Sequence, residues 1–374
     1  MKKILSLLLV TFLLLPFAAQ GDEGLSADES IPTEYAKAQV IETLELEFDK
    51  DYGAGMTVDY QKVLVKITSG QFEGKELTIE NSTTGNPAYD IWVNEGDKIL
   101  LIVEILADEI FNAYIVDFQR DTYIFILTAL FLFLIVIIGK QQGLKAVLTL
   151  GLTVLIIGKI MLPLLFQGYN PVILALLTGI SVTAITLAII GGLTKKALAA
   201  TIGTAGGLFT AALIAIAIGK VSNLKGLSGE EAQMLLYIPQ GIQFDFRGLL
   251  FAGIIIGALG AVMDVSMSIA SSMEEIKKVG TNLRLKELIM SGMNVGRDIM
   301  GTMSNTLILA YTGTSIPLLL LFMAYEQPFI KLINMDFLAT EFIRALSGSI
   351  GLVAAIPITA VVAGFLFSQE KKRT

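Results

Sequence analysis

Long apolar segments dominate the chain from Thr122 onward, and each is about 20 residues or longer. Because about 20 apolar residues in a helix cross the hydrocarbon core of a bilayer, each segment predicts one membrane-spanning helix. The predicted spans are residues 122–139, 146–166, 171–193, 197–219, 248–272, 298–324 and 339–367. The pattern therefore predicts an α-helical polytopic membrane protein with about seven transmembrane helices, which form a bundle over residues 122–367.

A second pattern precedes these segments, with apolar and polar residues alternating between about residues 36 and 118. Residues 62–67 and 99–104 show this period of two, and turn signals occur at residues 69–70 and 95–97. Five or six short strands in this space favour an all-β domain, either an OB-like barrel or a sandwich. We expect it to occupy residues 22–121.

The first residues resemble an export signal. Met1, Lys2 and Lys3 precede an apolar run over residues 4–19, and Ala19-Gln20-Gly21 is compatible with a cleavage site. Residues 1–21 are therefore predicted to be a signal peptide or an uncleaved N-terminal helix. Either alternative makes the β domain extracytoplasmic.

The amino-acid composition excludes several kinds of catalytic and metal-binding site. The chain is 54% hydrophobic and has no His and no Cys, so imidazole relays, thiol nucleophiles and the usual zinc sites are excluded. We therefore predict no catalytic residues, no cofactor and no enzyme activity, whereas a metal ion bound by oxygen ligands stays open. Residues 22–121 carry a net charge of −15 and the rest of the chain +8. The acidic part argues against binding to nucleic acid.

Basic residues gather in alternate connections between the predicted spans. They are Lys140, Lys145, Lys195, Lys196, Lys277, Lys278, Arg284, Lys286, Arg297, Lys371, Lys372 and Arg373. Connections rich in Lys and Arg stay in the cytoplasm, so the chain is expected to end in a basic cytoplasmic tail at residues 368–374. This orientation agrees with an exported β domain.

Two stretches of the predicted membrane region carry a resemblance to a known family. They are residues 257–272, GALGAVMDVSMSIASS, and residues 291–307, SGMNVGRDIMGTMSNTL. By these stretches the chain resembles the YibE/F family of bacterial multi-pass membrane proteins, and the likeness extends over nearly the whole chain. The resemblance implies an exported β domain ahead of a helical domain in a bacterial plasma membrane. It implies no activity, so the function must be argued from the residues.

Asp264 is the leading candidate for a functional residue, because a charge at the centre of a span costs at least about 2.5–3.5 kcal/mol. We expect it to face the interior of the bundle. Ser268 lies one turn further along the same predicted helix face, and Asp298, Thr302 and Asn305 share a face of the next helix. These two polar stripes are predicted to face each other and bind a solute or ion. The alternative is that the hydroxyls and Asn305 only join helices, and that Asp298 only begins one.

Three of the predicted spans contain further signals. Glu341 and Arg344 have the spacing of an ion pair within one helix turn, at the outer mouth of the bundle. Pro317 and Pro357 predict kinks. Gly203–Gly207 has the small-x-x-x-small spacing of a close helix contact.

Two functions of different classes fit these observations. The first is a permease in the lipid bilayer for a small solute or ion, with Asp264 as the binding or coupling carboxylate. The alternative is a receptor or envelope-assembly factor, whose exported β domain binds a ligand or a protein partner. An intramembrane enzyme fits least, because it needs a second carboxylate or a nucleophile–base pair near Asp264.

Overall fold

The computed structural model describes residues 31–51, 57–86, 88–238, 241–280 and 283–368. The predicted signal segment, residues 1–21, and most of the basic tail lie outside these residues. The chain divides into two compact units, Met1–Phe133 and Leu134–Thr374. Each unit is described by itself below.

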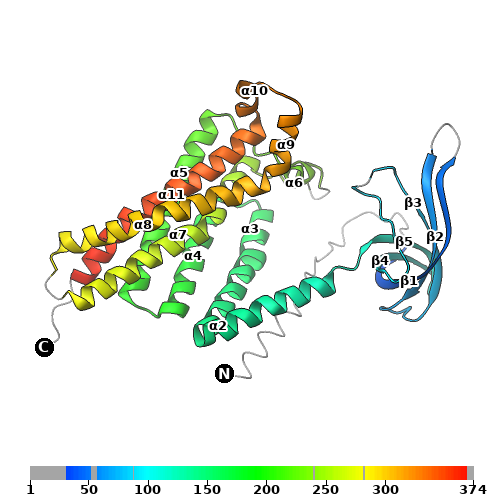
Figure 1. The fold of residues 1–374 in the computed structure, drawn as a ribbon, viewed down its shortest axis with the longest axis horizontal. Helices are drawn as coiled ribbons and strands as arrows, with labels where there is room; N and C mark the ends of the chain where they lie inside the picture. The colour runs from blue at the N-terminus through cyan, green and yellow to red at the C-terminus, as the bar shows by residue number, and fades with distance from the viewer. Residues whose placement is uncertain (1–30, 52–56, 87, 239–240, 281–282, 369–374) are drawn as a thin grey trace. The chain divides into compact units, whose positions relative to one another are not determined.

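The first unit contains one sheet of five antiparallel strands in the order β3-β2-β1-β4-β5. The strands are β1 (Thr33–Asp51), β2 (Thr57–Ile67), β3 (Glu76–Ser82), β4 (Lys98–Leu106) and β5 (Glu109–Phe118). Figure 1 shows β1 and β2, in blue, as a long hairpin. The sheet is a half-barrel, which confirms the predicted all-β domain and agrees with its barrel alternative.

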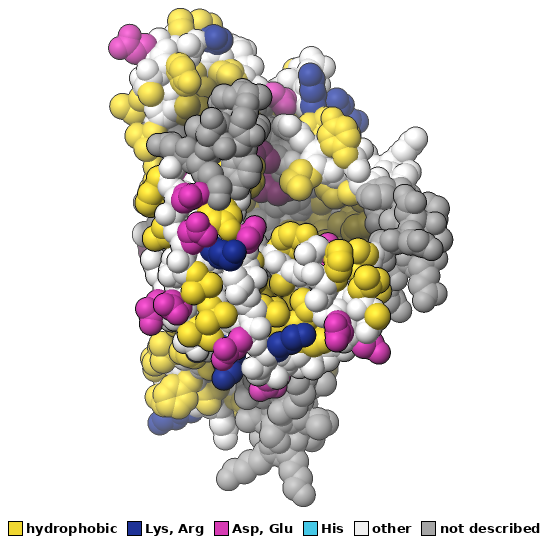
Figure 2. Space-filling model, turned by 90° about the vertical axis from the view of Figure 1, so that its right-hand side faces the viewer, with side chains coloured by type: hydrophobic (Ala, Val, Ile, Leu, Met, Phe, Trp, Pro, Cys, Tyr) yellow, Lys and Arg dark blue, Asp and Glu magenta, His cyan; other side chains and the backbone are white. Residues whose placement is uncertain are grey.

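Alternation along the strands builds the core of this domain. Val63, Val65 and Ile67 on β2 are at most 1% exposed, and the inward residues of β4 are equally buried. The residues between them point outward, since successive side chains of a strand lie on opposite faces. On the face of the molecule seen in Figure 2, Asp and Glu side chains are spread among hydrophobic ones. The acidic surplus of the sequence is therefore accommodated on the surface.

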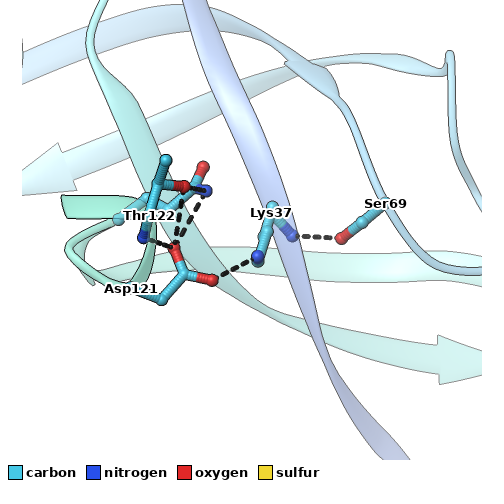
Figure 3. Close-up of polar contacts among 5 residues, drawn as sticks. Lys37, Ser69, Asp121 and Thr122 are labelled. Carbon is cyan, nitrogen blue, oxygen red and sulfur yellow. Dashed lines mark hydrogen bonds and ion pairs between the residues drawn. The ribbon is translucent and has the colours of Figure 1, made fainter. Parts of the chain in front are cut away.

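A polar cluster joins the sheet to the first long helix, α2 (Asp121–Ile156). The Lys37 ammonium on β1 donates to the Asp121 carboxylate in the first turn of α2, and the Lys37 backbone N–H donates to Ser69 Oγ at 2.9 Å (Figure 3). The same carboxylate accepts from the Thr122 backbone N–H at 2.7 Å. An acidic group here also suits the positive end of the helix dipole. The start of α2 is thus fixed to the sheet.

The first apolar helical stretch covers 46 residues, Asp121–Phe166, as α2, a short π-helix η1 (Ile157–Met161) and α3 (Leu162–Phe166). A straight helix of that length is about 69 Å long at 1.5 Å per residue, twice what a bilayer requires. Lys140 breaks it, with φ 50° and ψ −122°. A Cβ at Gly143 would collide with the Ile135 carbonyl oxygen, so the chain folds back tightly after the break. The break separates the first two predicted spans.

The second unit is a bundle of apolar helices. It contains α4 (Pro171–Gly191), α5 (Lys195–Val221), α6 (Glu230–Met234), the 3-10 turn η2 (Leu235–Tyr237), α7 (Phe246–Val279), α8 (Leu285–Thr314), α9 (Ile316–Ala324), α10 (Phe329–Ile333) and α11 (Asp336–Ser368). Within the described residues, five helices are long and apolar enough to cross a membrane, or six if α8 and α9 form one bent span. With the first stretch divided at Lys140, these helices correspond to the seven predicted segments.

The predicted prolines behave differently from each other. The bend between α8 and α9 is 59° and lies at Ser315, two residues before Pro317, as expected because proline has no N–H to donate to the preceding turn and its ring clashes with the carbonyl four residues earlier. Pro357 lies inside α11, which is one helix from Asp336 to Ser368.

Small residues hold α5 and α11 together at the centre of the bundle. Cβ atoms at Gly207 and Gly351 would each lie within 2.8 Å of the other residue's carbonyl oxygen, so the two backbones touch. Gly203, one turn away on α5, packs against Thr359. The predicted small-x-x-x-small contact therefore forms, and it permits the dispersion contacts that drive helix association in lipid.

Candidate functional site

Asp264 lies on α7, whose first turn is capped by Asp245: its Oδ1 accepts from the Gly248 backbone N–H at 2.9 Å. One narrow stripe of α7 is exposed. Its members between residues 248 and 275 are Gly253, Gly257, Gly260, Asp264, Ser268 and Glu275. They recur every three to four residues, which is one face of a helix. The exposed stripe of α7 therefore contains only glycine, serine and acidic residues.

Other helices of the bundle expose a different kind of face. The exposed side chains of α5 include Leu198, Ile202, Phe209 and Leu213, and those of α11 include Phe342, Leu346, Ile350 and Phe365. Bulky apolar side chains of this kind are stable against lipid tails, whereas a carboxylate is costly there. The stripe of α7 is thus unlike the exposed faces of α5 and α11.

The candidates on α8 also lie on an exposed face. Asp298, Thr302 and Asn305 are all exposed, while Gly296 and Leu307 pack against neighbouring helices. Asp298 is nine residues from Leu307, and Asn305 is nine residues from Gly296. Nine residues are two and a half helical turns, so each polar residue lies opposite a packing residue. The polar side of α8 is turned away from the interface that α8 makes with the bundle.

The register of α7 and α8 gives the depth of these residues. Gly292 packs against Met273, and Gly296 against Ile269, so the two helices run antiparallel with Asp264 about level with Thr302. Asp264 is nine residues from Met273 and therefore points away from this part of the interface. The two stripes share a depth. Asp264 points away from the part of the interface at Met273 and Ile269, whereas Gly257, on the same face of α7 as Asp264, lies against Tyr311 of α8.

Asp264 differs from its expected orientation, because its side chain is exposed and not directed into the bundle. The core face of α7 is already filled by apolar residues such as Val262, Val265 and Ile269. In the part of the chain that the structure describes, no hydrogen bond or ion pair joins Asp264, Ser268, Asp298, Thr302 and Asn305 to one another; the Thr302 hydroxyl donates to the Ile299 carbonyl at 2.9 Å. The same described residues contain no group of three acidic side chains suited to a metal ion.

A second polar group lies where α8 ends and α11 begins. Glu341 and Arg344 form the ion pair that their spacing predicts, with an Nη2–Oε1 distance of 3.4 Å. Sequence reasoning missed Tyr311, whose buried hydroxyl lies against Gly257 of α7. Its signal in the sequence is the seven-residue distance from Ser304, which places both on one helix face.

A five-stranded half-barrel followed by a bundle of long apolar helices defines a membrane protein with one folded β domain ahead of the membrane region in the chain. Two family models match the chain: a YibE/F-like protein over residues 127–369 and the YibE/F family N-terminal domain over residues 33–118. The chain belongs to the YibE/F family. Neither a curated protein nor a solved structure matches it.

Proposed function

We propose that this protein is a permease for a small solute or ion, and that Asp264 is its intramembrane binding or coupling carboxylate. The observation that carries the proposal is the exposed stripe of α7, where Gly253, Gly260, Asp264 and Ser268 occupy positions at which other helices expose bulky apolar residues. A charge at this depth costs at least about 2.5–3.5 kcal/mol in lipid, so the stripe requires water, a polar solute or protein beside it.

The stripe has the properties of one wall of a polar path. Gly253 and Gly260 leave space next to the helix, while Asp264 and Ser268 supply oxygen atoms that bind cations or polar solutes. No catalytic group is required, so the proposal assigns no enzyme activity and no cofactor. Because Asp298, Thr302 and Asn305 form a second exposed polar stripe at the same depth, they are proposed as further binding residues on α8.

The proposed location is a bacterial plasma membrane, with the β domain extracytoplasmic and the C-terminus cytoplasmic. Support comes from the ends of the helices. Lys196 Nζ at the start of α5 lies 3.0 Å from Glu274 Oε2 near the end of α7, and Ile289 near the start of α8 packs against Gly364 near the end of α11. These four helix ends share one end of the bundle. The start of α5, the end of α7 and the start of α8 are basic, and Lys371, Lys372 and Arg373 follow α11 in the sequence, as the positive-inside rule requires of a cytoplasmic face.

Single cysteines test the polar path directly, because the natural chain contains none. Cysteines replace Gly260 and Ser268 on the stripe, and Ile350 on the apolar exposed face of α11 is the control. The reagent is a membrane-impermeant charged methanethiosulfonate, applied to full-length protein in proteoliposomes. Thiolates form in water and not in hydrocarbon, so we expect the two stripe positions to react and the control to stay unreactive.

The result that contradicts the proposal is protection of both stripe positions while a cysteine at Ser82, on the β domain, reacts fully. Lipid or a protein helix would then cover the stripe. Addition of a true substrate should slow the reaction at Ser268 more than at Gly260, since Ser268 is the residue with an oxygen ligand.

A receptor or assembly role is the second candidate, and one observation favours it. Leu44, Leu46 and Phe48 are 48–67% exposed on alternate positions of β1, in a part of the strand that β4 does not pair, since β4 pairing ends at Gln39. Exposed apolar rows and free strand edges are used to bind protein partners. A photocrosslinking residue at position 46 should give one discrete adduct in intact cells, and one at Glu45, on the opposite face, should give none.

A further inference from the structure

Among the residues that the structure describes, five buried side-chain polar atoms have no hydrogen-bond partner, and four of them belong to α8 and α11, which pack against each other. These four are Tyr311 Oη and Ser304 Oγ on α8, and Arg344 Nε and Ser349 Oγ on α11. Each is a hydrogen-bond donor, and the cost of burying an unpaired donor is about 1–3 kcal/mol. Native proteins have few such groups, so four on two packed helices indicate a missing acceptor.

Packing contacts place Tyr311 and Arg344 at one level. Gly348 of α11 packs against Leu307 of α8, with 3.1 Å between a Cβ at Gly348 and Leu307 Cδ2. The two helices are antiparallel. Tyr311 is four residues after Leu307 on α8, and Arg344 is four residues before Gly348 on α11, so these two residues lie level with each other. The charges of Arg344 and Glu341 both act on the Tyr311 hydroxyl.

Gly257 of α7 completes the site. A Cβ at this residue would lie 2.5 Å from the Tyr311 hydroxyl oxygen, so the absence of a side chain provides the space that the hydroxyl occupies. Three helices therefore converge around one guanidinium and one phenol. The Arg344 side chain is 33% exposed and that of Glu341 is 26% exposed, so part of each is reachable from outside the bundle, whereas Arg344 Nε and Tyr311 Oη are buried.

The donor count exceeds the acceptor count in this group. A guanidinium has five N–H donors, and Glu341 engages Arg344 only through Nη2, at the long distance of 3.4 Å. Nε has no partner, and neither does the Tyr311 hydroxyl. A planar guanidinium with free N–H groups beside a hydroxyl donor matches the oxygens of a carboxylate or phosphate, which accept two parallel hydrogen bonds.

We infer that Arg344 and Tyr311 bind an oxyanion, either the carboxylate or phosphate of a small solute or the phosphate of a lipid headgroup. Glu341 holds the guanidinium when the oxyanion is absent and competes with it for the same N–H groups. The inference does not rest on the proposed role of Asp264, which lies seven residues from Gly257 along the same face of α7, and it is tested by binding instead of transport.

The test is the thermal stability of full-length protein in dodecyl maltoside, a detergent without phosphate. Sodium phosphate and sodium acetate are compared with sodium chloride at equal ionic strength and pH, and phosphatidylglycerol is added in a separate arm. Phosphate or acetate should raise the melting temperature if the ligand is a solute, and phosphatidylglycerol alone should raise it if the ligand is a lipid. Arg344→Gln should weaken the effective binding about tenfold or more.

Two further variants separate an oxyanion site from a purely structural ion pair. Glu341→Gln removes the competing carboxylate, so it should strengthen the anion response, whereas a structural pair predicts only lower stability without anion. Tyr311→Phe should weaken the response and leave the anion-free melting temperature unchanged or higher, because it removes a buried donor without a partner. If Arg344→Gln does not fold, Arg344→Lys keeps the charge without the planar fork and serves instead.

Arg297→Gln is the matched control, because it removes one exposed positive charge from α8 at a distance from this site. It should retain the full response. No stabilisation by phosphate, acetate or phosphatidylglycerol in the natural protein, or an equal response in Arg344→Gln, would overturn the inference. Water would then be the partner of the buried donors.

Discussion

Replacing Asp264 by Asn removes a charge and keeps the shape of the side chain, so its effect on stability depends on what surrounds the residue. In the described structure Asp264 is exposed and makes no ion pair or hydrogen bond, and Lys159, the one basic residue inside the second predicted span, is exposed in the π-helix η1. Beside a water-filled path the charge is already solvated. The change should then alter the free energy of unfolding by less than about 0.5 kcal/mol, as for other solvated surface positions.

Two other environments of Asp264 predict different changes in the free energy of unfolding. If the carboxylate faces lipid, its neutralisation should stabilise the protein by up to about 2.5–3.5 kcal/mol. If it is one half of a buried ion pair, the change leaves a charge unpaired and should cost about 3–5 kcal/mol. A second change, Lys159→Met, would restore stability only in the ion-pair case. The sign and the size of the change in the free energy of unfolding therefore distinguish the three environments.

The assay is the melting temperature of full-length protein in nanodiscs at pH 7, where the carboxylate of a solvated Asp is ionised. Asp245→Ala is the comparison, because Asp245 caps α7 and its loss should cost about 0.5–2 kcal/mol. We expect Asp264→Asn to match the natural protein and Asp245→Ala to melt earlier. A melting temperature of Asp264→Asn that corresponds to a change of several kcal/mol in the free energy of unfolding, in either direction, would refute the reasoning.

Three further predictions follow from other parts of the structure. A cysteine at Ser82 should be labelled from outside intact cells and one at Gly280 should not; labelling of Gly280 would reverse the orientation. Gly351→Leu should lower the melting temperature strongly, because its side chain meets the α5 backbone, whereas Gly301→Ala, with open space around it, should be tolerated; equal effects would contradict the packing. Arg120 donates to Asp117 at 2.5 Å and lowers the pKa of that carboxyl, so its stabilising effect is complete above about pH 4 and is lost as the pH falls through the lowered pKa. Chemical denaturation at pH 7 and pH 3 should therefore show a larger cost of Asp117→Asn at pH 7 than at pH 3.

The elements of the fold were predictable because their signals are local. A period of two defines the strands of the half-barrel, and the apolar segments define the long helices. Pro317 predicts the break at Ser315, and the spacing of Glu341 and Arg344 predicts their ion pair. Each of these features depends on residues that are close together in the chain.

The orientation of Asp264 was not predictable for a physical reason. In a soluble helix apolar residues indicate the buried face, but in a membrane helix they face both lipid and neighbouring helices. Glycine and alanine on α7 suit either position, so the sequence alone does not identify the exposed stripe. Tyr311 was missed because its site requires Gly257 and Arg344, which belong to two other helices.

The most direct measurement of the central claim is a density map of the full-length protein in lipid nanodiscs, inspected along the exposed stripe of α7. The account predicts a solvent-filled cavity, or density for a small solute or ion, next to Asp264 and Ser268. Ordered acyl chains in contact with the stripe from Gly253 to Ser268 would contradict it, because lipid would then occupy the proposed path.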